Sequence, residues 1–363
     1  MCTMKRIYAA LGAIMMGVSM FTGCQTAGNP AAVTKKASDT AGTASADKVK
    51  NGDSAATGAD STAEKEKISV VTTIFPEYDW VREIVGGEAD RYDLTMLQDN
   101  GVDLHSYQPT AQDVAKISDC DLFVYVGGES DSLVGDALKN MTNKNMQVIN
   151  LLDVLGNSVK EEEVVEGMQA EEEDGDSDAT EEEEPEYDEH VWLSLKNAKV
   201  LCAAIADALE TIDPDHAESY ETNETAYNEK LEKLDTEYQQ MVDQANRKTV
   251  LFGDRFPFRY LVDDYGLTYY AAFVGCSAES EASFETITFL ANKVDELGLP
   301  CVLTIEGAKH RIAETIVENT KEKNQKICTM DSLQSTTSEN VQNGVTYLKS
   351  MEDNLSVLKE ALN

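Results

Sequence analysis

The sequence predicts an α/β fold of two similar lobes, each a parallel sheet flanked by helices, with one long spine helix joining them and a ligand cleft between them. Strand-like runs alternate with helical patterns in the first half of the chain, and the same scheme repeats in the second half. Between these halves lies a long stretch with an apolar helical stripe. Strands that alternate with helices are typical of parallel sheets.

The first lobe is expected over residues 68–212, with strands at four short apolar runs. These runs read ISVVTTIFP, YDLTMLQD, DLFVYVGG and MQVINL, and helical patterns such as YDWVREIVGG and AQDVAKIS lie between them. The second lobe is expected over residues 248–363, with strands at TVLFGD, LTYYAAFVG, CVLTIEG and KICTMD. Its helices are predicted at FRYLVDDYG, FETITFLANKVDELG and HRIAETIVENT.

The linking segment at 213–247 is predicted to be one long helix, from about Asp215 to Asn246. Its apolar side chains recur mostly at intervals of three and four residues, which is the spacing of a helical stripe. They are Ala217, Tyr220, Tyr227, Leu231, Leu234, Tyr238, Met241 and Ala245. At about 1.5 Å per residue the helix would be about 45 Å long, which suits a rigid spine. A coiled-coil dimer is the alternative, although sustained heptads would then extend over more turns.

The N-terminus is predicted to be a secretory signal, residues 1–23, followed by a lipid-anchor site. A basic start at Lys5 and Arg6 precedes an apolar run of about 15 residues, shorter than the roughly 18 to 20 that a spanning helix needs. The run and the following Cys24 resemble the bacterial lipobox, which implies cleavage before Cys24 and its acylation. An ordinary cleaved signal with an incidental cysteine is the alternative. Residues 24–67 would then be a flexible tether, because they hold almost no large apolar side chain.

The composition argues against a nucleic-acid-binding protein. The formal net charge is −37 and the pI is near 4.3, whereas phosphate backbones are bound by clusters of Lys and Arg. Asp and Glu make up 17 of the 29 residues from 161 to 189. Such charges repel one another, so a solvated, disordered loop is expected at 160–189. A role in attracting cations to a cleft is the alternative.

Five cysteines follow the predicted signal and anchor: Cys120, Cys202, Cys276, Cys301 and Cys328. An odd number without CxxC spacing is neither a disulfide framework nor a zinc knuckle. One bridge among the last three would be compatible with an exported protein, but the sequence does not select the pair.

Two histidines stand in well-defined turns, although the chain has only four in 363 residues. His105 lies in a polar turn before a predicted helix, and His190 lies between the acidic run and another predicted helix. In open parallel sheets, ligands bind beyond the carboxyl ends of the strands. Asp254, Glu306 and Asp331 stand at such ends in the second lobe. All five side chains are therefore candidate metal ligands.

Six motifs follow one another in a fixed order along the chain. They are HSYQPTAQDVAKISDCDLFVYVGGESD, EHVWLSLKNAK after the acidic segment, FRYLVDDYGL, SAESEASFETI, CVLTIEG and KICTMDSL. Any one of them alone would be a weak signal. Together, over residues 68–363, they resemble the cluster A-I, or TroA-like, family of metal-binding lipoproteins, which deliver zinc or manganese to ABC transporters.

The resemblance implies one ion held between the lobes by four side chains. The first two positions match His105 and His190, and the fourth, an aspartate after the last strand, matches Asp331. The third is usually His in zinc binders and Glu in manganese binders. Direct counting places Arg255 there, and a guanidinium cannot ligate a cation.

Two substitutes remain for the third ligand. Asp254, which fits if the turn is one residue longer, would complete a mixed nitrogen and oxygen set that suits manganese or iron as readily as zinc. It is favoured because it stands at a strand end. His310 would instead supply a third imidazole and a set typical of zinc. Glu306 is expected to accept hydrogen bonds behind the ligands.

The resemblance thus implies an extracytoplasmic solute-binding lipoprotein, anchored to the cell membrane, that captures one divalent ion and delivers it to an ABC permease and its ATPase. Zinc ranks first as the ion, with manganese or iron as alternatives. The chain is expected to be a monomer. It is not expected to be an enzyme, because four protein ligands leave no open position on the ion for an activated water. Two rival functions remain: a metal-dependent hydrolase, although no nucleophile elbow lies near Glu306, and a surface adhesin on the same fold.

Overall fold

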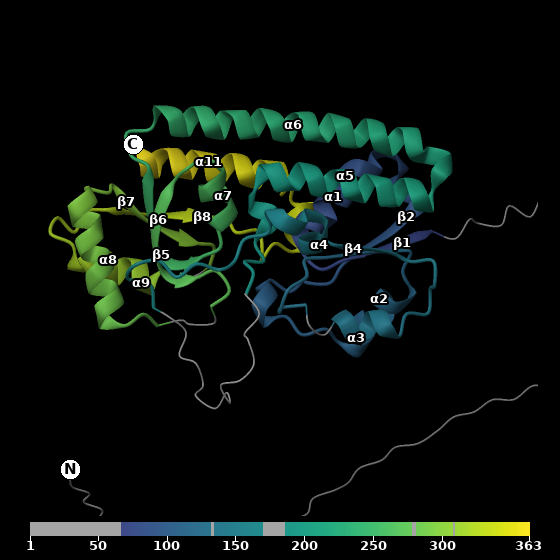
Figure 1. The fold of residues 1–363 in the computed structure, drawn as a ribbon, viewed down its shortest axis with the longest axis horizontal. Helices are drawn as coiled ribbons and strands as arrows, with labels where there is room; N and C mark the ends of the chain where they lie inside the picture. The colour runs from purple at the N-terminus through teal and green to yellow at the C-terminus, as the bar shows by residue number, and fades with distance from the viewer. Residues whose placement is uncertain (1–66, 132–133, 170–185, 278–280, 308) are drawn as a thin grey trace, which may run out of the picture. The chain divides into compact units, whose positions relative to one another are not determined.

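The computed structural model describes residues 67–131, 134–169, 186–277, 281–307 and 309–363. The predicted signal, the anchor Cys24, the tether up to residue 66 and the middle of the acidic segment lie outside these ranges. Within them, no helix combines the length and the apolar character that crossing a membrane would require. Figure 1 shows the two sheets, with the longest helix running over both.

The first lobe is a parallel sheet with the strand order β2-β1-β3-β4. Its strands are β1 (Ile68–Thr72), β2 (Tyr92–Met96), β3 (Leu122–Tyr125) and β4 (Gln147–Asn150). Its helices are α1 (Phe75–Val85), α2 (Ala111–Asp119), α3 (Val134–Lys139) and α4 (Leu151–Leu155). The α2 helix starts where the sequence sets it, because Thr110 and Asp113 form a capping box. All four strands predicted for this lobe are confirmed.

The second lobe repeats this plan with the strand order β6-β5-β7-β8, again all parallel. Its strands are β5 (Thr249–Phe256), β6 (Thr268–Val274), β7 (Cys301–Ile305) and β8 (Lys326–Met330). Its helices are α7 (Arg259–Asp264), α8 (Phe284–Leu297), α9 (Arg311–Asn319), α10 (Ser338–Gln342) and α11 (Tyr347–Leu362). The pairing of β5 with β6 shifts register between Phe252 and Arg255. These four strands were also predicted.

Two long helices connect the lobes, α5 (Leu195–Ile212) and α6 (Ala217–Gln244). The predicted spine helix is confirmed as α6, which packs against α1, α5 and α11 (Figure 1). Its buried side chains are Tyr220, Tyr227, Leu231, Leu234, Tyr238 and Val242. These side chains pack against other helices of the same chain. They are therefore not exposed to form the coiled-coil dimer that was the alternative.

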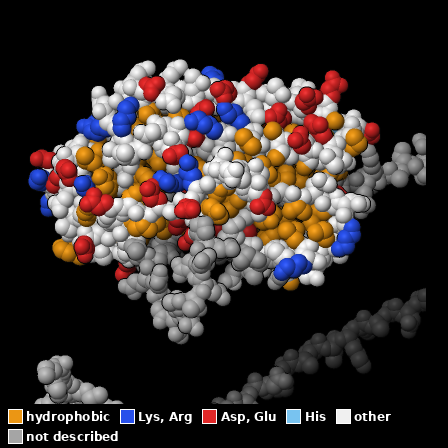
Figure 2. Space-filling model, viewed as in Figure 1, with side chains coloured by type: hydrophobic (Ala, Val, Ile, Leu, Met, Phe, Trp, Pro, Cys, Tyr) orange, Lys and Arg blue, Asp and Glu red, His pale blue; other side chains and the backbone are white. Residues whose placement is uncertain are grey.

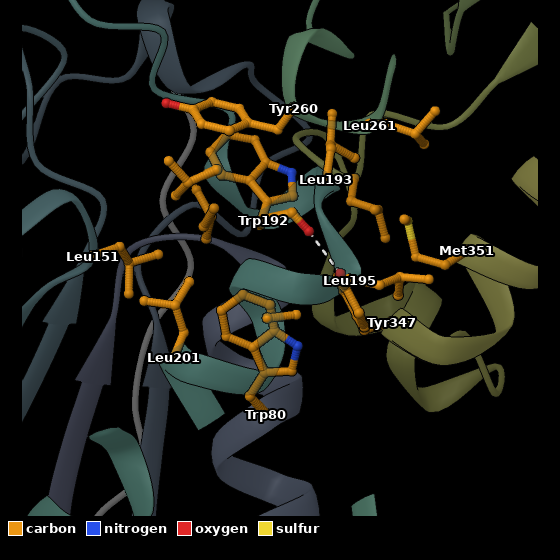
Figure 3. Packing of buried hydrophobic residues seen from close by; sticks show 14 of the residues in the cluster. Trp80, Leu151, Trp192, Leu193, Leu195, Leu201, Tyr260, Leu261, Tyr347 and Met351 are labelled. Carbon is orange, nitrogen blue, oxygen red and sulfur yellow. Dashed lines mark hydrogen bonds between the residues drawn. The ribbon is translucent and has the colours of Figure 1, made fainter. Parts of the chain in front are cut away.

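One hydrophobic core extends through both lobes. Figure 3 shows its centre, where Trp80, Trp192 and Tyr347 meet side chains from both halves of the chain. The Tyr347 hydroxyl donates to the Trp192 carbonyl at 2.6 Å, and the Trp192 indole N–H donates to the Ser332 carbonyl at 2.9 Å. These bonds fix the segment that follows His190 directly to the second lobe.

The two described ends of the acidic segment pair with each other. Glu161 and Tyr187 form an antiparallel bridge, and the Asp188 N–H donates to the Lys160 carbonyl at 2.9 Å. Asp188 and Glu189 are buried, and their carboxylates have hydrogen-bond partners there. Asp188 bonds with the backbone N–H and the ring of His190, and Glu189 accepts from the Ser130 N–H. The prediction of a solvated loop over 160–189 is therefore wrong for Asp188 and Glu189, whereas Glu161, Glu163 and Tyr187 are exposed. Residues 170–185 lie outside the description.

The five cysteines after the anchor are all free, so the expected possibility of one bridge is not realised among them. On the face seen in Figure 2, acidic and basic side chains are interspersed, and no continuous basic patch appears on that face.

Candidate metal centre

His105 is held in a 3-10 turn, Leu104–Ser106, beyond the end of β2. The Asp103 carboxylate caps this turn by accepting a hydrogen bond from the His105 N–H at 3.0 Å, and Leu104 anchors the turn in the core with 1% of its surface exposed. The Nδ1 atom of His105 lies 2.8 Å from Ser130 Oγ. The ring is thereby oriented so that Nε2 points toward His190.

His190 is fully buried just before the 3-10 turn Val191–Leu193, which leads into α5. One carboxylate oxygen of Asp188 accepts from the His190 backbone N–H at 2.8 Å and lies 3.0 Å from its Nδ1. A carboxylate on one ring nitrogen fixes the tautomer and makes the other nitrogen a better ligand. Here the other nitrogen is again Nε2.

The two Nε2 atoms face each other at 3.2 Å. Zinc bonds to imidazole nitrogen at about 2.0–2.1 Å, so two nitrogens of one tetrahedral ion lie about 3.3 Å apart. The ring centroids are 5.2 Å apart and the ring planes are inclined at 58°. The two imidazoles therefore already have the spacing of two ligands of one ion.

Cys276 is the third member of this cluster. Its Sγ, with one ring nitrogen of His105 and one of His190, forms a group in which all the potential ligand atoms lie within 4.8 Å of one another. Gly275 makes the approach possible, because a Cβ there would lie 2.8 Å from His190 Cε1. The Cys276 backbone N–H donates to a Glu162 carboxylate oxygen at 3.1 Å.

Sequence reasoning missed Cys276 as a site residue. It considered cysteines only for CxxC spacing and for disulfide bridges. A usable signal was nevertheless present, because Cys276 follows the predicted strand LTYYAAFVG directly. The rule that ligands stand beyond the carboxyl ends of parallel strands, which selected Asp254, would have selected Cys276 as well.

The buried groups of the centre shift one another's pKa values. Burial and the neighbouring His190 lower the pKa of His105 to about 3, so this ring is neutral and its lone pair is available to a cation. Burial opposes a charge on His190, but Asp188, through its charge and its hydrogen bond, raises the pKa of His190 above its usual value. Burial also raises the pKa of Glu189.

Glu189 lies behind His105. One of its carboxylate oxygens accepts from the Ser130 N–H at 2.9 Å. The other has no hydrogen-bond partner among the described residues and lies 3.7 Å from His105 Nδ1. The close approach of the Glu189 side chain to the backbone requires Gly128, where a Cβ would come within 2.3 Å of a carboxylate oxygen. Each histidine of the pair thus has a buried carboxyl group beside its Nδ1, Glu189 for His105 and Asp188 for His190.

The other predicted ligands lie outside this cluster. The Asp254 carboxylate accepts from the N–H groups of Arg255 at 2.9 Å and Ile305 at 3.4 Å. Asp254, Arg255 and His310 line a neighbouring cavity of about 650 Å³. His310 directly precedes α9, and its Nδ1 is buried without a hydrogen-bond partner among the described residues.

Asp331 and Glu306 make structural hydrogen bonds at the ends of β8 and β7. The Asp331 carboxylate accepts from the Leu333 N–H at 2.8 Å. Glu306 accepts from the Ser332 N–H at 2.7 Å and from the Ser332 hydroxyl at 2.6 Å. The structure thus brings together His105 and His190, but neither Asp254, Asp331 nor His310 joins them.

Arg255 connects the two lobes beside the centre. Its guanidinium, on β5, pairs with Asp103 at 2.7 Å and donates to the Ser277 carbonyl at 3.3 Å. Asp103 caps the turn of His105, and Ser277 follows Cys276. Arg255 therefore positions the segments that carry two members of the cluster, although it cannot bind a cation itself.

Comparisons with known proteins agree with this architecture. The zinc-binding lipoprotein AdcA of Streptococcus pneumoniae (strain ATCC BAA-255 / R6) is 33% identical over 296 residues, which are 81% of this chain and 56% of AdcA. The high-affinity zinc uptake system protein ZnuA of Bacillus subtilis (strain 168) is 30% identical over 297 residues, 82% of this chain and 88% of that protein. The chain spans about half the length of the AdcA relatives that it matches.

Solved structures show the same fold. The Zn(II)-bound ZnuA-like domain of AdcA from Streptococcus pneumoniae has a TM-score of 0.63 and 30% identity, with 82% of this chain and 99% of that chain covered. The laminin-binding protein Lmb of Streptococcus agalactiae, described as bifunctional with adhesin and metal transporting activity, has a TM-score of 0.64 and 26% identity, with 82% and 100% covered. The predicted fold and the resemblance to the TroA-like family are thereby confirmed. A family model described as ZnuA, zinc-uptake complex component A, periplasmic, matches residues 70–361, and the chain therefore belongs to this family.

Proposed function

We propose that this chain is an extracytoplasmic solute-binding lipoprotein that captures one divalent transition-metal ion and delivers it to an ABC permease. Zinc is the first choice of ion, with manganese or iron as alternatives. The ion would be held by His105 and His190, and the observation that carries the proposal is the 3.2 Å spacing of their Nε2 atoms in a buried site. Zinc is also named for the AdcA and ZnuA relatives and is bound in the related AdcA domain.

The partner and the location follow from the family and from the N-terminal sequence. A zinc-uptake complex needs a permease that receives the ion from the binding component and an ATPase that drives its transport. The relatives include a protein named as a lipoprotein, and Cys24 stands at a lipobox-like signal in this chain. We place the folded part outside the cytoplasm, attached to the cell membrane through Cys24, and acting as a monomer.

Binding and release describe the centre better than hydrolysis does. A hydrolytic zinc site needs a water on the ion and a general base placed to activate it. Glu306, the base considered from the sequence, is occupied by hydrogen bonds to Ser332 and Ser335. Family membership also favours a solute-binding protein over an enzyme.

The direct test is the metal content of the purified full chain. Protein prepared without chelator is expected to hold one zinc per chain in elemental analysis, and manganese should displace it only at large excess, since zinc binds nitrogen ligands more tightly. Protein that stays empty after incubation with zinc, manganese and iron in turn would overturn the proposal.

Replacing Arg255 by Ala is expected to weaken zinc binding without abolishing it. The change removes the ion pair with Asp103, which caps the turn of His105, and the contact with the Ser277 carbonyl. Because the ion pair is partly exposed, we expect an increase in Kd of about three- to tenfold. Competition with a chromophoric chelator measures the change. Arg247→Ala, which removes a contact to Asn363, is the matched control, and equal Kd values for the two variants would contradict a positioning role for Arg255.

Adhesion is a second candidate function, favoured by the likeness to Lmb, which is described as a bifunctional protein with adhesin and metal transporting activity. In this reading the same fold presents a surface to a host matrix protein such as laminin. Binding of the chain to immobilised laminin, measured with and without a chelator, tests it. If the chain does not bind laminin in either condition, adhesion to laminin is rejected, and the proposal of metal capture is unaffected.

A further inference from the structure

We propose that Cys276 is a ligand of the captured ion, so that the centre is a thiolate site with two imidazoles and one cysteine sulfur. This assignment rests on the proposed function, because it concerns the ion that the chain captures. It selects borderline and soft cations, with Zn²⁺, Co²⁺ and Cd²⁺ as the class that fits, and it disfavours Mn²⁺, which prefers oxygen ligands.

The geometry of the three ligand atoms supports this set. Zinc binds sulfur at about 2.3 Å and imidazole nitrogen at about 2.0–2.1 Å, which puts sulfur and nitrogen about 3.6 Å apart in a tetrahedron. Sγ of Cys276 and the two ring nitrogens lie within 4.8 Å of one another. Movements of about 1 Å are enough to bring all three onto one ion.

The three ligands come from separate segments that only the tertiary fold unites. His105 follows β2, His190 precedes α5, and Cys276 follows β6 of the second lobe. Gly275 lets the turn after β6 lie against the His190 ring. An ion bound to this set therefore links the two lobes, which a pair of histidines from the first lobe alone would not do.

Arg255 explains why a cysteine is needed. The position that would carry a third ligand on β5 holds this guanidinium, and Asp254 beside it is bonded to backbone N–H groups instead of facing the histidines. The Arg255 side chain contacts the Ser277 carbonyl, next to Cys276. Arg255 therefore has two effects: it occupies the ligand position on β5, and it stabilises the turn that carries Cys276.

Coordination requires that Cys276 give up its proton. The S–H bond breaks, the sulfur forms a bond to the ion, and the proton leaves to the solvent, so each bound ion releases one proton from the thiol. Two neutral imidazoles and one thiolate leave a divalent ion with one positive charge. The buried carboxylates of Asp188 and Glu189 lie around the histidines and compensate that charge.

Cobalt provides a direct readout, because a cobalt–thiolate bond gives an intense charge-transfer absorption in the near ultraviolet that nitrogen and oxygen ligands do not give. The full chain with Cys2→Ser and Cys24→Ser, so that the cysteines of the predicted signal and anchor do not contribute, is titrated anaerobically with Co²⁺. We expect the band to saturate at one equivalent, to be absent in Cys276→Ser, and to persist in Cys328→Ser. Cys328 is the matched control because it is also partly exposed.

Zinc affinity gives the second measurement. Cys276→Ser is expected to raise the zinc Kd by at least about tenfold, because a hydroxyl is a far weaker ligand than a thiolate, while Cys328→Ser leaves it unchanged. A chain with Cys2→Ser and Cys24→Ser that binds cobalt through His105 and His190 but shows no charge-transfer band overturns the assignment of Cys276 and spares the proposed function. A wild-type chain that binds no divalent ion overturns both. Absence of the band from the chain that keeps Cys276 and lacks only Cys2 and Cys24 overturns the assignment by itself, so the test survives poor folding of Cys276→Ser.

Discussion

Zinc binding is expected to be lost when His105 and His190 are both replaced by Ala. Their Nε2 atoms face each other at 3.2 Å, and no other pair of imidazoles lies together among the described residues. If a zinc site is worth about 10–16 kcal/mol over four ligands, then two ligands contribute about 5–8 kcal/mol, which is more than about a thousandfold in Kd. Isothermal titration with zinc, at protein concentrations in the micromolar range, would then give no measurable heat of site binding.

The matched control replaces the other two histidines, His216 and His310. His216 pairs with Asp213 and Glu88, away from the centre, and His310 was the alternative third ligand from the sequence. We expect His216→Ala with His310→Ala to bind one zinc with unchanged affinity. Equal stoichiometry in the two double variants would rule out His105 and His190 as the ligands. A loss in the control alone would assign the ion to His310 and its cavity.

Replacing Trp192 by Ala is expected to lower the free energy of unfolding by about 3–5 kcal/mol, the range for a large buried aromatic side chain. Trp192 is fully buried between the lobes, and its ring lies beside His190 with 5.3 Å between the centroids. Its indole N–H also donates to the Ser332 carbonyl. The substitution leaves a cavity and removes the donor of this buried bond, so both effects act in the same direction.

Urea unfolding followed by far-ultraviolet circular dichroism measures the loss, with the midpoint and slope of the transition compared between variants. Val200→Ala is the control, because Val200 lies on α5 with 49% of its surface exposed, and a change within about 0.5 kcal/mol is expected. If Trp192→Ala unfolded at the same urea concentration as this control, the core would not join the lobes as described.

The fold could be predicted from the sequence because its signals are local. Each strand is a short apolar run between turn residues, and α6 shows its buried stripe at the spacing of a helix. The turns of His105 and His190 were also found locally, since polar residues mark them, and Asp103 caps the turn of His105. These signals depend on near neighbours in the chain and do not require knowledge of the tertiary structure.

The third ligand could not be placed from sequence because its position depends on how the lobes pack. Asp254 was expected at the end of its strand, but β5 runs on to Phe256 and shifts register before Arg255, so the carboxylate is taken up by backbone N–H groups. Asp331 and Glu306 do stand at strand ends, yet they bond to their own turns. Cys276 meets the histidines only because Gly275 and Arg255 bring distant segments together.

The hydrophobic core runs through both lobes, and α6 packs along it. This core limits the movements by which the chain could release a bound ion. A hinge motion that separates the two lobes would expose Trp192, Tyr347 and their neighbours to water. The free energy of that exposure would be comparable to the free energy of unfolding. Unloading is therefore expected to proceed by small displacements of the turns that hold the ion. Under the proposed function, a docking permease would need to displace only those turns, while the shared hydrophobic core stays packed.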